Sequence, residues 1–157
     1  MQRVLFDTDL YIDWIEAGLR EELILGQAFV RYMSAVVILE LQAGAVDPKS
    51  ARAVQDLYRT FDRTGRLVLP SADTYWRAGT VLRDLQRRRG HELRRRYRLV
   101  NDCLIALSSL QIGATVVTRS EKGAISWMAR KSRSFLVTTV APICRLERAM
   151  RQSFTSR

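Results

Sequence analysis

The sequence predicts an α/β fold, with a central parallel sheet of four to five short strands flanked by helices. The chain has 157 residues, which suits a single domain, and 47% of them are hydrophobic, enough for a buried core. Short apolar runs alternate along the chain with segments of helical spacing. Buried strands separated by helices are typical of a parallel sheet with right-handed crossovers.

The first half of the chain contains three of the expected strands. Leu10, Trp14 and Ile15 share one helical face, and Gly44 and Pro70 are breaks between elements. The expected elements are a strand at 3–6, a helix at 10–19, a short helix between Gly18 and Gly26, a strand at 32–36, helices at 38–43 and 50–64, and a strand at 67–69.

The second half continues the same alternation. Ser71 and Asn101 are good helix caps, and Gly113 is a typical helix end. The expected elements are a helix after Ser71, a helix at 102–112, a strand at 114–118, a short helix at 124–131, a strand at 136–140 and a helix opened by Pro142. Residues 1–150 are expected to form the domain and 151–157 a frayed tail. Trp14, Trp76 and Trp127 are predicted to be core residues.

The charge of the chain suggests a polyanionic partner. There are 26 Lys and Arg residues against 16 Asp and Glu, a net charge of +10, and nearly all of the positive charge is arginine. Arginine binds phosphate in a bidentate manner, so nucleic acid is the first expectation. The alternative is a charge that serves only solubility.

The sequence also predicts a cytoplasmic protein. The sequence lacks the basic start and following apolar stretch that indicate a signal peptide. No apolar run approaches the roughly 20 residues of a membrane span. Cys103 and Cys144 are therefore expected to be free thiols in a reducing compartment.

Acidic residues follow several of the predicted elements. Asp7 comes directly after the first strand, Glu40 lies one helical turn after the second, and Asp102 opens a helix. These positions meet at one edge of a parallel sheet, where ligands bind. Several oxygen ligands around open space suit Mg²⁺ or Mn²⁺, and such an ion beside a polyanion is typical of phosphodiester hydrolysis.

Each acid also has a structural interpretation. Asp7 or Asp9 is suited to cap the helix that follows, and Asp102 would be stabilised by a helix dipole without any function. Glu40 has apolar neighbours on both sides, which argues against a solvated position. The joint pattern favours a site.

Four segments carry a resemblance to a known family: 4–9 (Val-Leu-Phe-Asp-Thr-Asp), 34–44, 101–106 and 113–119. In order and spacing they resemble PIN-domain ribonucleases, in particular the VapC-type toxins of toxin–antitoxin pairs. That family usually has a strand-ending Asp-Thr-Asn or Asp-Thr-Asp, a Glu-Leu-x-x-Gly, an Asp that opens a helix, and a strand that ends in Thr.

The resemblance implies a Mg²⁺- or Mn²⁺-dependent endoribonuclease, a homodimer, and a cognate antitoxin that covers the active site. By position, Asp7, Glu40 and Asp102 would be the catalytic metal ligands. Asp9 fills a place where the family often has Asn or Asp, and is a further candidate ligand. Thr8 is a candidate hydrogen-bond partner for an acid, and Thr118 matches the strand-end threonine.

The sequence departs from the family at one position. Many members have an acid or Asn two residues after the strand-end threonine, whereas this chain has Ser120 followed by Glu121. Either Glu121 takes over as a ligand, or Ser120 holds a water, or a second metal binds weakly. The departure questions two-metal catalysis more than it questions the fold.

A run of arginines precedes Asp102 and is interpreted as a track for the RNA backbone. The alternative is a solvated helix face and loop. The candidate RNA-binding residues are Arg87, Arg88, Arg94, Arg95, Arg96, Arg98 and Arg119.

Two other functions stay open. A non-catalytic RNA-binding module on a decayed PIN fold would bind RNA regardless of metal. Asp7 and Asp9 after a strand also resemble the start of a HAD-type phosphatase, with Asp7 as nucleophile and Asp9 as acid. That family has Thr or Val where this chain has Tyr11, and a late Gly-Asp-x-x-x-Asp motif that this chain lacks.

Overall fold

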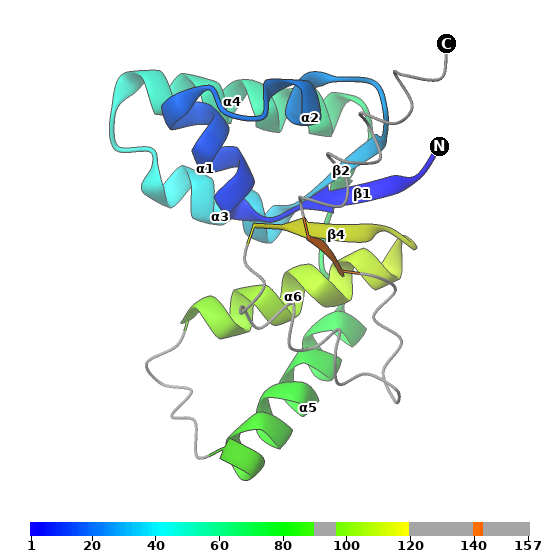
Figure 1. The fold of residues 1–157 in the computed structure, drawn as a ribbon. Coiled ribbons are helices and arrows are strands. Elements are labelled where there is room, and N and C mark those ends of the chain that lie inside the picture. Colours follow the sequence, from blue (N-terminus) through cyan, green and yellow to red (C-terminus); the bar gives the residue numbers. More distant parts are fainter. Residues whose placement is uncertain (90–96, 120–139, 143–157) are drawn as a thin grey trace.

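The structure is a computed structural model that describes residues 1–89, 97–119 and 140–142, and in it strands and helices alternate along the chain (Figure 1). The strands are β1 (Arg3–Phe6), β2 (Val30–Ser34), β3 (Leu67–Val68), β4 (Thr115–Thr118) and β5 (Val140–Pro142). The helices are α1 (Thr8–Ala17), α2 (Glu21–Leu25), α3 (Ala35–Gly44), α4 (Pro48–Arg63), α5 (Ala72–Arg89) and α6 (Tyr97–Gln111).

All five strands are parallel and form one sheet in the order β3–β2–β1–β4–β5. The central strand β1 pairs with β2 and with β4, for example through Phe6 opposite Val117. The carboxyl ends of the strands therefore share one edge of the sheet. The predicted α/β class and parallel sheet are confirmed.

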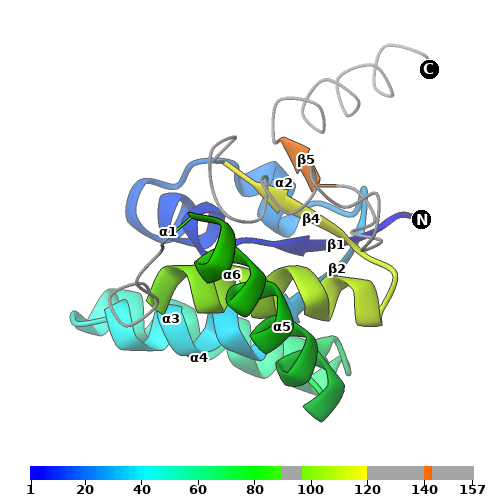
Figure 2. The ribbon, with the colours of Figure 1, turned by 90° about the horizontal axis from the view of Figure 1, so that it is seen from below.

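Helices cover both faces of this sheet. In Figure 1, α1, α2 and α4 lie above the sheet, and α5 and α6 lie below it and against each other (Figure 2). Helix α3 contacts α1, α4 and α6, so it joins the two layers. This arrangement explains why the strands are apolar on both faces.

The core centres on β1 and its neighbours. Val4, Leu5 and Phe6 are completely buried, and the Phe6 ring meets the Tyr11 ring edge-on, with centroids 6.1 Å apart. From α6, the run from Cys103 to Ser109 is buried. Within the described ranges, no helix is both long and apolar enough to cross a membrane.

Two predicted helix starts are wrong. Strand β2 ends at Ser34, whose hydroxyl accepts a hydrogen bond from the Val36 amide at 3.2 Å, so α3 begins before the predicted residue 38. Helix α6 begins at Tyr97, since the apolar residues ahead of Asn101 continue its helical spacing. Pro142 is the last residue of the edge strand β5, a position that tolerates proline, and the helix predicted to follow it lies outside the described residues.

The predicted core tryptophans differ in their placement. Trp14 packs against the core, but Trp76 is 78% exposed on α5, because it lies off the face that buries Ala78 and Leu82. Trp127, the predicted helix at 124–131, most of the predicted strand at 136–140 and the tail at 151–157 lie outside the described residues.

Candidate active site

The candidate site lies where β1 and β4 end. Asp7 directly follows β1 and caps α1, since its Oδ1 accepts the Thr8 amide at 2.8 Å. The Asp7 backbone amide donates to the Val117 carbonyl at 2.9 Å, and the Thr118 hydroxyl donates to Asp7 Oδ2 at 2.9 Å. Both oxygens of this carboxylate are thereby oriented by groups from two elements.

The environment of Asp7 disfavours its charged form. Burial raises the pKa of this carboxyl above its ordinary value, and the hydrogen bonds from Thr118 and Thr8 lower it by less. The negative charges of Asp9 and Glu40 raise the pKa further. Within the described part of the chain, no positive charge lowers the pKa of Asp7, and such perturbed carboxyls are common at functional sites.

Glu40 reaches the same edge from α3. Its Oε2 accepts a hydrogen bond from the Thr8 hydroxyl, and its Oε1 accepts one from Asn101 Nδ2 at 2.8 Å. The predicted hydrogen bond between Thr8 and an acid is present. Thr8 connects the two acids, because its amide binds Asp7 and its hydroxyl binds Glu40. We call Asp7 and Glu40 the inner acids.

Asn101 has a different role from the predicted one. It lies inside α6, one turn after the helix begins, so it does not cap the helix and instead donates to Glu40. Asp102 follows it and is partly exposed. Burial, and to a lesser degree the charge of Asp102, raise the pKa of the Cys103 thiol to about 12, so this thiol is inert at neutral pH.

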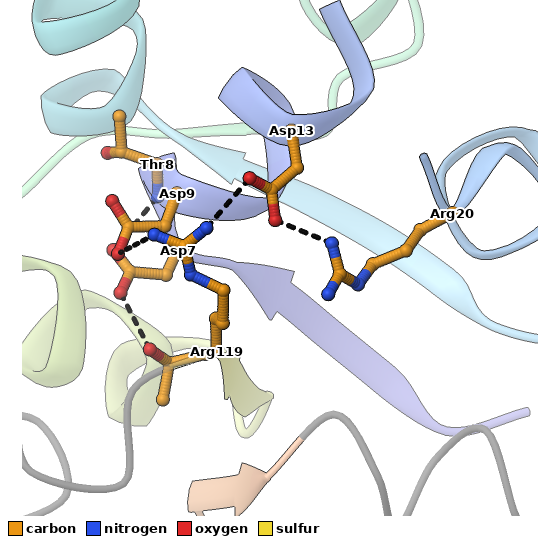
Figure 3. Close-up of polar contacts among 7 residues, drawn as sticks. Asp7, Thr8, Asp9, Asp13, Arg20 and Arg119 are labelled. Atoms are coloured by element: carbon orange, nitrogen blue, oxygen red, sulfur yellow. Dashed lines mark hydrogen bonds and ion pairs between the residues drawn. The ribbon is translucent and has the colours of Figure 1, made fainter. Parts of the chain in front are cut away.

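A second group of acids lies beside the first and pairs with arginines. Arg119, directly after β4, contacts Asp13 Oδ1 through Nη1 at 2.8 Å and Asp9 Oδ2 through Nη2 at 3.8 Å (Figure 3). Arg20 Nη1 contacts the other Asp13 oxygen at 2.5 Å. We call Asp9 and Asp13 the outer acids.

The oxygen atoms at this edge suit a hard divalent cation by their chemistry. Carboxylates with hydroxyl neighbours are the donors that Mg²⁺ and Mn²⁺ take. However, in the part of the chain that the structure describes, no three His, Cys, Asp or Glu side chains stand close enough to hold a metal ion together. The structure thus links Asp7 and Glu40 through Thr8 without forming a closed ligand cluster with Asp102.

The chain matches the PIN domain family over residues 4–122. It belongs to the PIN domain family. The match covers β1 to β4 and every acid discussed above. This family match supports the resemblance to PIN-domain ribonucleases rather than the resemblance to HAD-type phosphatases. A search of curated proteins found no match to this PIN domain.

Solved structures share the fold of this PIN domain at low identity. VapBC2 from Rickettsia felis bound to a promoter DNA fragment and DNA-bound VapBC from Salmonella typhimurium each match with 17% identity and a TM-score of 0.60. Both matches cover 90% of this chain and 98% of the other. VapBC-1 from nontypeable Haemophilus influenzae matches with 20% identity and a TM-score of 0.57, covering 82% of this chain and 94% of that one.

The candidate RNA-binding arginines of this PIN domain are only partly described. Arg87 near the end of α5 and Arg98 at the start of α6 are exposed. Arg88 lies in α5, and Arg119 pairs with the outer acids. Five of the predicted site residues lie outside the described part of the chain: Arg94, Arg95, Arg96, Ser120 and Glu121.

Sequence reasoning missed three polar residues of this PIN domain. Asn101 was assigned to a cap, although a polar side chain beside apolar neighbours on a buried helix is itself a signal for a specific partner. Asp13 and Arg20 carry no such signal, because their ion pair and the one to Arg119 depend on how the sheet brings β4 to α1.

Proposed function

We propose that this chain is a metal-dependent endoribonuclease that acts in the cytoplasm as the toxin of a toxin–antitoxin pair. PIN family membership and the shared fold with VapBC structures support this proposal. The observation that carries it is the partly buried Asp7 carboxylate at the carboxyl edge of the sheet, with Glu40 and Asp9 close enough to raise its pKa.

Asp7, Glu40 and Asp102 would hold a Mg²⁺ or Mn²⁺ ion. When bound, such an ion supplies Lewis acidity and charge neutralisation for hydrolysis of a phosphodiester. Glu121 follows Ser120, the position at which the sequence departs from the family pattern, and is a further candidate ligand. An uncompensated carboxylate such as Asp7 is costly to bury unless a cation joins it, which is why the inner acids are the proposed cation site.

The other side chains would orient these ligands and hold the substrate. Thr118 and the Thr8 amide fix the two oxygens of Asp7, while the Thr8 hydroxyl and Asn101 fix those of Glu40. The RNA backbone would bind through the phosphate contacts of the arginine run from Arg87 to Arg98.

The proposed protein partners are a cognate antitoxin that covers the site and a second copy of the chain. The antitoxin is suggested by the VapBC structures that share this fold. The homodimer rests on the resemblance to VapC-type toxins alone.

The test is RNA cleavage by the purified full chain with Mg²⁺, with Mn²⁺ and with EDTA. We expect discrete cleavage with either metal, none with EDTA, and none with Glu40→Gln or Asp102→Asn. Asp56→Asn is the matched control, because Asp56 is an exposed acid on α4. Cleavage that persists in EDTA or in Glu40→Gln would overturn the proposal.

A non-catalytic RNA-binding module is the second candidate. It is favoured by the lack of a three-ligand cluster among the described residues. It predicts salt-sensitive RNA binding that is the same with and without metal, and the same in Asp102→Asn. RNA bound but not cut under any metal, by a preparation free of co-purified protein, would support this candidate.

A further inference from the structure

The outer acids hold their own cation within the protein. Arg119 bridges Asp9 and Asp13, and Arg20 binds the second oxygen of Asp13 (Figure 3). The Asp13 side chain is only 14% exposed, and that of Asp9 30%. The Arg119 side chain is 52% exposed, so solvent screens its 3.8 Å contact to Asp9 more than the pair of Arg20 and Asp13, yet its positive charge still lies beside both outer acids.

Arg119 is fixed in place by the sheet. It follows Thr118, whose hydroxyl binds Asp7 and whose strand pairs with β1. The Arg119 backbone therefore lies at the same edge of the sheet as the inner acids, and its side chain extends toward α1. Because the Asp13 contact is 2.8 Å, the side chain is held by a direct hydrogen bond as well as by charge.

The inner acids differ in the donors they accept. In the described ranges, the contacts of Asp7 and Glu40 come from hydroxyl, amide and backbone donors, all of them neutral. Neutral donors orient a carboxylate without cancelling its charge. A divalent cation is attracted to the acids whose charge remains, which are the inner ones.

We infer that Arg119 is the resident counter-ion of Asp9, so that Asp9 is not a metal ligand and the site binds one divalent cation on the inner acids together with Asp102. This inference rests on the proposed function and makes it more specific. Arg119 acts through Asp9, as a positioning residue. Its positive charge lies against Asp9, and the sequence has Ser120 where many family members have an acid or Asn, so both features disfavour a second metal ion.

The experiment measures Mn²⁺ binding to the full chain by calorimetry and by the EPR signal of free Mn²⁺, without RNA. The wild type should bind one ion, and Asp9→Asn should change its Kd by less than about twofold. Arg119→Gln should bind Mn²⁺ about five- to tenfold more tightly, or bind a second ion, because Asp9 is released. Adding Asp9→Asn to Arg119→Gln should reverse that gain.

Two further variants keep the test specific. Arg119→Lys keeps the positive charge and should bind Mn²⁺ as the wild type does. Arg59→Gln removes the same charge from an exposed position on α4 and should have no effect. The reversal by Asp9→Asn is a result that a merely structural role of Arg119 would not give.

The inference and the proposed function fail differently. If Asp9→Asn alone weakens Mn²⁺ binding as much as Asp7→Asn does, Asp9 is a ligand and only the inference is overturned. If Arg119→Gln and its double variant bind like the wild type, the counter-ion role is also overturned. If the wild type binds no Mn²⁺ in either assay, both the inference and the proposed metal-dependent nuclease are overturned.

Discussion

The inner and outer acids lie side by side at one sheet edge, yet their surroundings differ in kind. Asp7 and Glu40 accept hydrogen bonds from threonines and an asparagine, whereas Asp9 and Asp13 pair with Arg119 and Arg20. The first arrangement fixes geometry and leaves negative charge in place. The second cancels charge and connects α1 to the end of β4. Acids close together can therefore serve catalysis or stability, depending on whether their donors are charged.

The largest expected effect separates the two groups by activity. Asp7→Asn removes the charge of a proposed metal ligand and should lower RNA cleavage with Mg²⁺ at least about a hundredfold. Loss of a residue that only supports a metal ligand lowers metal affinity or activity about ten- to a hundredfold, and loss of the ligand itself should cost at least as much. Asp13→Asn should leave cleavage within about threefold, because its charge is already cancelled. Initial rates on one labelled RNA measure both. Equal losses of cleavage rate in Asp7→Asn and Asp13→Asn would show that the inner and outer acids do not differ in function.

The next effect concerns the neutral donors of the inner acids. Thr8→Val keeps the side-chain shape but removes the hydroxyl that binds Glu40, and should lower cleavage about ten- to a hundredfold. Asn101→Ala should act similarly, as the second donor to Glu40. Thr8→Ser, which keeps the hydroxyl, is the control and should retain most activity. Full activity in Thr8→Val would show that this orientation is not needed.

A smaller effect, on stability, is expected for the outer acids. Asp13→Asn leaves both Arg119 and Arg20 with a weakened partner, and should lower the free energy of unfolding by about 1–3 kcal/mol. Urea denaturation of the metal-free chain measures this value. Asp56→Asn, on an exposed helix face, should change it by less than about 0.5 kcal/mol. If Asp13→Asn lowers the free energy of unfolding no more than Asp56→Asn does, the ion pairs of the outer acids do not stabilise the fold.

The smallest effect has the opposite sign. The folded state raises the pKa of Asp7, so ionisation of this carboxyl destabilises the fold at any pH above that raised pKa. Asp7→Asn should therefore raise the Tm of the metal-free chain at pH 7, by about 2–4 °C for each kcal/mol regained. As the pH falls through the raised pKa, the wild type is protonated, and below 3.8 the gain should vanish. Thermal unfolding at pH 7 and pH 3 measures it, and a lower Tm at pH 7 would contradict it.

Much of the fold was predictable because its signals are local. The apolar run ending at Asp7 and the glycine at 113, with φ of +62°, mark elements that the structure contains. The exposed position of Trp76 was not predictable, because size and apolarity alone do not say which helix face the core covers. The early start of α6 was hidden by the arginines that precede it.

The candidate site was predictable only in its acids. Asp7 and Glu40 follow strands, so the rule that parallel strands end at one edge brings them together. Their partners were not predictable in detail, since the Asn101 contact to Glu40 joins residues 61 positions apart and depends on how α3 packs against α6. Arg119 was assigned to RNA because its charge is visible in the sequence and its ion pairs are not.

The central position of β1 has a consequence for how the chain is made. Asp7 is made before its partner Thr118, which lies 111 positions later, and β1 pairs with β4 at the same separation. Contacts of such long range form late and slowly. During synthesis the central strand must wait with one edge unpaired until β4 emerges, so this site is assembled only after Thr118 has been made.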